Sequence, residues 1–203
     1  MMKYFDNENM PVLLGMLAAA VAILIAVFLL VRHLYKTTDG RNTERIVKKY
    51  SEAYEREVIF PDGIGGYFFI DYLILLQGKI VALNIAKVKG YVFGGENIEA
   101  WTLIENNKST KFKNPLEDVK LFVNHAKDQL KFDGIMARVL FDSKCEFPKG
   151  VPEGVSQLAY FKKNMAAWAG EAHAAEATNK AWKTLSALLA ESRERYNKEV
   201  GVS

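Results

Sequence analysis

The longest apolar run in the chain spans residues 11–31, and none of its side chains carries a charge. At 1.5 Å per residue this run would form a helix about 31 Å long, which matches the hydrocarbon core of a bilayer. We therefore expect a transmembrane helix. A cleaved signal peptide is the alternative, but its apolar region is shorter and ends in a small-residue cleavage site, whereas this run ends in Leu29, Leu30 and Val31.

Charges on either side of this run predict how the helix is oriented. Residues 1–31 have a net charge of −1, whereas residues 32–50 carry six basic and two acidic residues. A basic flank stays in the cytoplasm. We expect residues 1–10 to lie outside a bacterial inner membrane, residues 32–43 to form a basic linker, and the rest to be cytoplasmic. The single cysteine, Cys145, fits a reducing compartment.

Beyond the linker, the hydrophobic pattern alternates between helical and strand-like periods. Residues 67–76 are almost continuously apolar, as in a strand buried on both faces, and a Gln-Gly turn joins them to a second buried strand at 79–86. The pattern predicts helices at 44–54, 115–130 and 163–198, strands at 57–60, 67–76, 79–86 and 135–141, two shorter strands within 87–104, and a short apolar stretch at 155–161. The order of helix, several strands, helix, strand and helix indicates an α/β fold.

This order divides the cytoplasmic part into a domain at residues 44–162 and a C-terminal amphipathic helix at 163–203. Five residues of that helix recur every seven positions: Trp168, Ala175, Trp182, Leu189 and Tyr196. This spacing places them on one helical face, which must be buried. The face either packs on its own domain or forms a surface for a protein partner or a second copy, with Trp168, Trp182, Leu189 and Tyr196 as anchors.

Composition limits the classes of function. Half of the residues are apolar and 12% are aromatic, which excludes a disordered chain. Residues 51–203 carry 20 basic and 20 acidic residues, so the net charge of +3 belongs to the region near the membrane. A neutral total favours a protein partner over nucleic acid, although local basic patches can be hidden in it.

One carboxylate interrupts the buried strand at residues 67–76. Asp71 is flanked by apolar residues, where a charge is costly unless it is paired, hydrogen-bonded or bound to metal. Asp71 could be a metal ligand or an acid–base group. It could equally be a polar residue that bonds to nearby backbone, and Asp71 alone does not separate these interpretations.

The surroundings of Asp71 carry a resemblance to a known family. The blocks concerned are Ile70-Asp71-Tyr72-Leu73-Ile74-Leu75, Lys79 to Leu83, Lys89-Gly90-Tyr91-Val92-Phe93-Gly94, Glu96-Asn97, Trp101 and Asn114-Pro115-Leu116. Over residues 44–161 the chain resembles the nuclease-related domain (NERD) family. The resemblance implies a restriction-endonuclease-like fold, in which a mixed central sheet is flanked by helices. It also implies a site in which an Asp, a Glu and a Lys act with a divalent metal.

Carried over by position, the family Asp is Asp71 and an assisting helix Glu is Glu44. The strand that should end in Glu-x-Lys instead reads Asn84-Ile85-Ala86. Asn lacks the charge that holds a hard cation, and Ala has no donor. Since side chains alternate along a strand, Lys87 and Lys89 point away from the face of Asn84 and Ala86.

We therefore expect a catalytically inactive domain that serves as a binding or assembly module and needs no cofactor. The alternative is an active nuclease that uses Asp71, Glu44 and a displaced Lys with Mg²⁺ or Mn²⁺. Two further patterns, Pro61-Asp62 and Asp142-Ser143-Lys144, resemble nuclease elements, but both are typical of turns.

Overall fold

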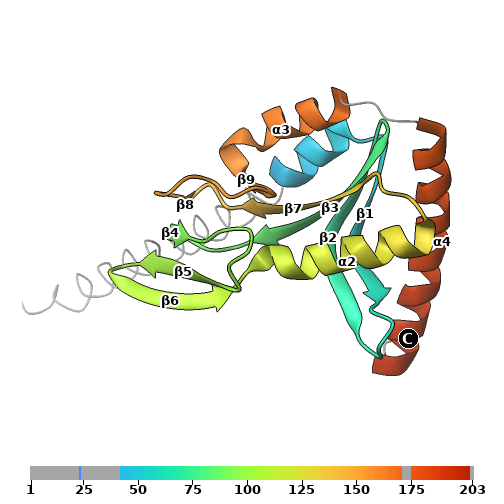
Figure 1. The fold of residues 1–203 in the computed structure, drawn as a ribbon, viewed down its shortest axis with the longest axis horizontal. Helices are drawn as coiled ribbons and strands as arrows, with labels where there is room; N and C mark the ends of the chain where they lie inside the picture. The colour runs from blue at the N-terminus through green and yellow to red at the C-terminus, as the bar shows by residue number, and fades with distance from the viewer. Residues whose placement is uncertain (1–22, 24–41, 171–174, 202–203) are drawn as a thin grey trace, which may run out of the picture. The chain divides into compact units, whose positions relative to one another are not determined.

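The structure, a computed structural model, describes residues 23, 42–170 and 175–201. Its strands form a five-stranded sheet in the order β1-β2-β3-β7-β9 and a four-stranded sheet in the order β6-β5-β4-β8 (Figure 1). The strands are β1 (Ala53–Pro61), β2 (Tyr67–Leu76), β3 (Lys79–Ala86), β4 (Gly90–Phe93), β5 (Ala100–Glu105), β6 (Lys108–Lys113), β7 (Ile135–Phe141), β8 (Cys145–Glu146) and β9 (Val155–Gln157).

The five-stranded sheet is mixed. β2 runs antiparallel to both β1 and β3. β7 is parallel to β3, and β9 is parallel to β7. β2 and β3 form the predicted hairpin, which closes with Leu76 opposite Lys79, and Gly78 takes a φ of 80° in its turn. A parallel neighbour needs a crossover connection, and the chain between β3 and β7 contains β4, β5, β6 and α2 (Pro115–Leu130).

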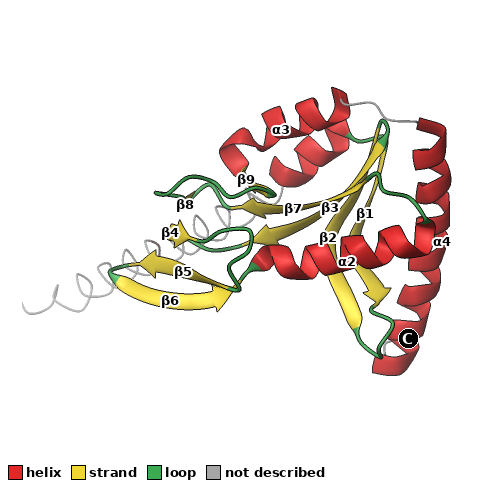
Figure 2. Ribbon diagram, viewed as in Figure 1, coloured by secondary structure: helices red, strands yellow, loops and turns green. Residues whose placement is uncertain are grey.

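Helices cover both faces of the five-stranded sheet (Figure 2). α2 and α4 (Ala175–Val200) pack on one face in a cluster that we call the α2-side core, which includes Leu73, Phe122 and Leu185. The helix at residues 42–50 and α3 (Leu158–Gly170) pack on the other face in the α3-side core. The α3-side core includes Val47, Ile74, Leu83, Phe161 and Met165. The prediction of a mixed sheet flanked by helices is confirmed.

Several boundaries differ from the sequence-based expectation. The first described helix ends at residue 50 rather than 54, and β1 begins at Ala53. The strands β6 and β8 were not predicted. A tight turn at Asn106 and Asn107, with φ values of 50° and 61°, joins β5 to β6. β6 carries Phe112 as its one apolar side chain, so it shows no apolar alternation in the sequence.

The C-terminal region contains two helices instead of one that starts at residue 163. α4 confirms the predicted long C-terminal helix, but residues 163–170 belong to α3. The two helices contribute to different cores, with Met165 in the α3-side core and Leu185 in the α2-side core. A single straight helix cannot contact both faces of a sheet. The residues at the seven-residue spacing therefore do not form one continuous helical face.

The predicted membrane segment at residues 11–31 lies outside the described residues, apart from Ile23. Within the part of the chain that the structure describes, no helix is both long enough and apolar enough to cross a bilayer.

Candidate functional site

Asp71 lies where the regular pairing of β2 is interrupted on both sides. On the β1 side the register pairs Val58 with Ile70 and Arg56 with Tyr72, but Glu57 adopts a left-handed conformation with a φ of 50°. On the β3 side the regular pairs run only as far as Tyr72 opposite Leu83. β2 and β3 therefore separate at the level of Asp71.

The side chain of Asn84 bridges the separated strands. Its Oδ1 accepts a hydrogen bond of 2.9 Å from the backbone N–H of Asp71, and its Nδ2 donates one of 3.2 Å to the carbonyl of Phe69. One amide side chain thus replaces the backbone bonds that a continued ladder would supply. Asn84 is half-buried, so its amide is not fully available to solvent.

The carboxylate of Asp71 makes the reciprocal connection. Its Oδ2 accepts a hydrogen bond of 2.6 Å from the backbone N–H of Ile85 in β3. Together with Asn84 it forms a three-bond connection between β2 and β3, which we call the strand clamp. This geometry agrees with the interpretation of Asp71 as a polar residue bonded to nearby backbone.

Glu44, the helix carboxylate, pairs with a cation of the chain itself. Its Oε2 lies 3.1 Å from Nη1 of Arg56 on β1, and the Arg56 guanidinium lies 5.6 Å from the ring centre of Tyr72. Burial raises the pKa of Tyr72 above its ordinary value; Arg56 opposes this shift, and the carboxylates of Glu44 and Asp71 add to it. Glu44 and Asp71 therefore both affect the pKa of the Tyr72 phenol, and Glu44 does so while it is paired with Arg56.

The third motif position supplies no polar group, because Ala86 has no donor or acceptor in its side chain. Lys87 and Lys89 are exposed in the connection that follows β3. No group of three or more His, Cys, Asp or Glu side chains suited to a metal ion occurs among the described residues. One oxygen of Asp71 accepts a backbone hydrogen bond, position 84 holds a neutral amide, and Glu44 is paired with Arg56. These three side chains therefore offer a divalent cation less free negative charge than two unpaired carboxylates would.

A comparison with protein-family models decides the family. The model of the nuclease-related domain matches residues 39–147, which is more than half of the 203 residues. The chain belongs to the nuclease-related domain (NERD) family. Comparisons with curated proteins and with solved structures found no match. The NERD match ends before β9, so α3 and α4 lie beyond it.

Two glycines of the NERD blocks have structural roles. Gly90 takes a φ of 113°, and a Cβ there would clash with the backbone carbonyl of Ile104. Gly94 lies against the indole of Trp101, which would collide with any Cβ at this position. Since Trp101 is fully buried and donates a 3.0 Å hydrogen bond to the carbonyl of Gly95, these glycines secure the four-stranded sheet to the core.

The Asn-Pro block of the NERD domain is a helix cap. Oδ1 of the buried Asn114 accepts a 2.9 Å hydrogen bond from the N–H of Leu116, and Pro115 takes the first position of α2. The Nδ2 of Asn114 donates to the carbonyl of Glu96 at 3.2 Å. This block therefore fixes α2 to the connection between β4 and β5.

Both of the other nuclease-like patterns form local turns. Oδ1 of Asp62 accepts hydrogen bonds from the N–H groups of Ile64 and Gly66, at 2.9 and 2.8 Å, and these bonds lower the pKa of Asp62. Oδ1 of Asp142 accepts a 3.1 Å bond from the N–H of Lys144. Aspartates in such turns bind their own backbone.

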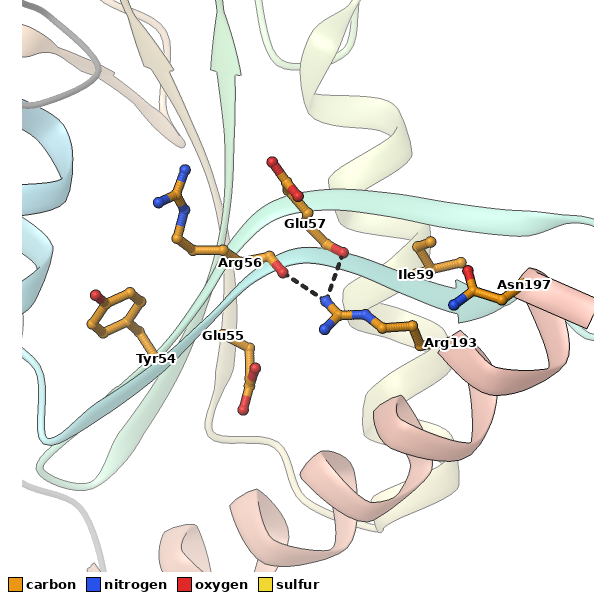
Figure 3. Close-up of a pocket in the computed structure, with 7 residues that line it drawn as sticks. All are labelled: Tyr54, Glu55, Arg56, Glu57, Ile59, Arg193 and Asn197. Atoms are coloured by element: carbon orange, nitrogen blue, oxygen red, sulfur yellow. Dashed lines mark hydrogen bonds between the residues drawn. The ribbon is translucent and has the colours of Figure 1, made fainter. Parts of the chain in front are cut away.

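An open cavity of about 790 Å³ lies between β1 and α4 (Figure 3). The residues that line it are Tyr54, Glu55, Arg56, Glu57, Ile59, Arg193 and Asn197. At its inner end Nη2 of Arg193 donates to the carbonyls of Arg56 and Glu57, at 2.9 and 3.1 Å. Figure 3 shows how the left-handed turn at Glu57 presents two consecutive carbonyls to one guanidinium.

Sequence reasoning missed Arg56 and Arg193. Neither belongs to a motif, and their contacts depend on register and on long-range packing. The one available signal for Arg56 was its place between Glu55 and Glu57, just before the predicted strand at residues 57–60.

Of the four anchor residues predicted on the C-terminal apolar face, three contact the protein's own cores. The Trp168 ring lies 6.4 Å from that of Phe161 and 5.2 Å from the guanidinium carbon of Arg138. Trp182 packs against the α2-side core, of which Leu189 is a member. These contacts correspond to the interpretation in which the helices pack on their own domain.

Tyr196, the fourth anchor residue, contacts the first residues of β2, next to the turn of the β1–β2 hairpin. Its ring centre is 5.1 Å from that of Tyr67 and 5.9 Å from that of Phe69. The hydroxyl of Tyr67 donates a 2.7 Å hydrogen bond to Glu199, which raises the pKa of Tyr67. The last turns of α4 are thereby attached to the hairpin.

Proposed function

We propose that the chain is a single-pass protein of a bacterial inner membrane, and that its cytoplasmic NERD domain binds a partner without cleaving nucleic acid. The apolar run at residues 11–31 and the basic flank at residues 32–50 support the anchor and its orientation. The membership in the NERD family supports a domain descended from nucleic-acid enzymes.

The strand clamp carries the proposal that catalysis is lost. A nuclease of this pattern needs Asp and Glu oxygens free for a metal and a Lys near the attacking water. In this chain Oδ1 of Asn84 accepts a 2.9 Å hydrogen bond from the N–H of Asp71, and Oδ2 of Asp71 accepts a 2.6 Å bond from the N–H of Ile85. Ala86 leaves the Lys position without an ammonium group.

An active nuclease with a rearranged site is the second candidate. One observation favours it: Arg56, which pairs with Glu44 at 3.1 Å, also lies 5.6 Å from the ring centre of Tyr72, the residue after Asp71 in β2. Against it, Arg56 already occupies Glu44 at 3.1 Å, and the nearest lysines along the chain, Lys87 and Lys89, are exposed.

Cleavage assays test the two candidates directly. The full-length protein, purified in a mild detergent, is incubated with single- and double-stranded DNA and RNA in Mg²⁺ or Mn²⁺, beside an Asp71→Ala control. We expect equal, background-level cleavage by both proteins. Cleavage that disappears in Asp71→Ala would overturn the proposal and establish the second candidate.

A gain-of-function variant tests whether the geometry of the site persists. The double substitution Asn84→Glu and Ala86→Lys restores the residue types of the family motif. Activity that appears in this variant and is lost again on adding Asp71→Ala would show that the two replacements alone removed catalysis. The anchor is tested separately, by a C-terminal green fluorescent protein fusion that should fluoresce in the membrane fraction.

A further inference from the structure

The four-stranded sheet has one buried face. Its register places Val92 opposite Leu103 and Trp101 opposite Phe112, and directly opposite residues share a face. Val92 and Trp101 belong to the α2-side core, and Leu103 and Phe112 pack against it. The intervening residues of the three strands must therefore point to the other side.

That other side, which we call the outer face, combines aromatic, apolar and basic side chains. The register assigns to it Tyr91, Phe93, Thr102, Ile104, Ser109 and Lys111, and it also places the exposed Glu146 of β8 opposite Tyr91. Tyr91 is 49% exposed. Its three apolar side chains, Tyr91, Phe93 and Ile104, belong to neither core and pack against neither.

Lysines concentrate around the outer face. Lys111 is exposed on the edge strand β6, and the ammonium group of Lys149 lies 5.9 Å from the ring centre of Phe93. Residues 87–113 and 142–149, which form this sheet and its connections, carry seven lysines against four glutamates and one aspartate. Residues 51–203 as a whole are neutral, so the neutral total conceals a local basic excess.

We propose that the outer face binds single-stranded nucleic acid, with bases stacked on Tyr91 and Phe93 and phosphates held by Lys111 and Lys149. Residues two apart on a strand are about 6.6 to 6.8 Å apart, which lets their rings receive successive bases of an extended strand. Aromatic side chains on the face of a four-stranded sheet are known to bind single-stranded nucleic acid by stacking on its bases. The inference deepens the proposed function, because it names the partner of the non-cleaving domain.

Fluorescence anisotropy tests the inference. The full-length protein in detergent is titrated into a fluorescein-labelled 20-nucleotide single-stranded DNA, with EDTA present so that cleavage cannot contribute. We expect Tyr91→Ala to weaken binding at least about five-fold, the lower limit for loss of one stacked base, and Tyr91→Phe to retain it. Lys111→Gln should reduce the slope of log affinity against log salt by about 0.7.

The matched control is Tyr160→Ala, because Tyr160 is 60% exposed but lies on α3, away from the four-stranded sheet. It should bind as the wild type does. Because Tyr91 is largely exposed, Tyr91→Ala should unfold at the wild-type temperature, which separates lost binding from lost folding.

Three results would overturn the inference: no binding by the wild type, equal binding by Tyr91→Ala and wild type, or equal loss in Tyr160→Ala. A fourth would be Tyr91-dependent binding of phosphatidylglycerol in mixed micelles without any binding of the oligonucleotide, which would assign the face to a membrane surface. These failures leave the proposed absence of cleavage intact, whereas cleavage in Mg²⁺ would refute that proposal without affecting binding in EDTA.

Discussion

Replacement of Asn84 by alanine is the perturbation that isolates the strand clamp. It removes the acceptor for the N–H of Asp71 at 2.9 Å and the donor to the carbonyl of Phe69 at 3.2 Å. The third bond, from the N–H of Ile85 to Asp71, does not involve Asn84 and should persist. The substitution therefore tests two of the three bonds that hold β2 and β3 together where their ladder ends.

The expected loss follows from those two bonds. A typical intramolecular hydrogen bond contributes about 0.5–1.5 kcal/mol to stability. Because the site is half-buried, water can reach part of the freed backbone, so we expect a loss of about 1–2 kcal/mol in the free energy of unfolding. For a protein of this size that corresponds to a decrease in Tm of roughly 2–8 °C.

Guanidinium unfolding followed by tryptophan fluorescence measures this loss, since Trp101 is fully buried and should report unfolding. Asn97→Ala is the matched control, because Asn97 is exposed and should change stability by less than about 0.5 kcal/mol. If Asn84→Ala is as stable as Asn97→Ala, Asn84 does not clamp the strands and its replacement of the family Glu needs another explanation.

Three further predictions concern single residues. Gly94→Ala should lower the free energy of unfolding by about 1–3 kcal/mol, because the new Cβ meets the rigid ring of Trp101. In the same thermal melts Gly95→Ala should lower it less, because its Cβ meets only the movable end of the exposed Ile98 side chain, 3.1 Å away. Burial raises the pKa of Cys145 to about 11, so its reaction with a disulfide reagent near pH 8 should be slow until denaturant is added, and fast labelling of the native protein would contradict the buried placement. Backbone hydrogen bonds lower the pKa of Asp62 below 3.8, so the stability that its carboxylate contributes to the fold is complete above about pH 4 and is lost as the pH falls through the lowered pKa. In urea melts the difference in stability between the wild type and Asp62→Ala should therefore shrink in acid. A difference that grows in acid would refute this.

Elements with a strong local signal were predictable from the sequence. β2, β3, α2 and β7 have the bounds that their apolar runs and the Asn-Pro cap indicated. A strand that is buried on both faces is apolar along its whole length, so it can be recognised from its own residues without knowing which strands lie beside it. The sequence also shows Asn84 and Ala86 at the two positions where the family resemblance implies Glu and Lys.

The arrangement of the site was not predictable in the same way. Whether Asp71 faces a metal or a backbone amide depends on how β3 leaves β2, and this depends on register beyond the hairpin. The pairing of Glu44 with Arg56 joins a helix to an edge strand and leaves no periodic trace. The division of the C-terminal region into α3 and α4 was missed because a seven-residue repeat can arise from two separately packed helices.

The central claim, that the motif positions hold strands together instead of a metal, is tested most directly by Mn²⁺ binding. Electron paramagnetic resonance measures the free Mn²⁺ that remains when the ion is titrated with the full-length wild type or with Asp71→Ala. Our account predicts the same free Mn²⁺ for both proteins at every concentration. Wild-type binding of one Mn²⁺ that disappears in Asp71→Ala would contradict it.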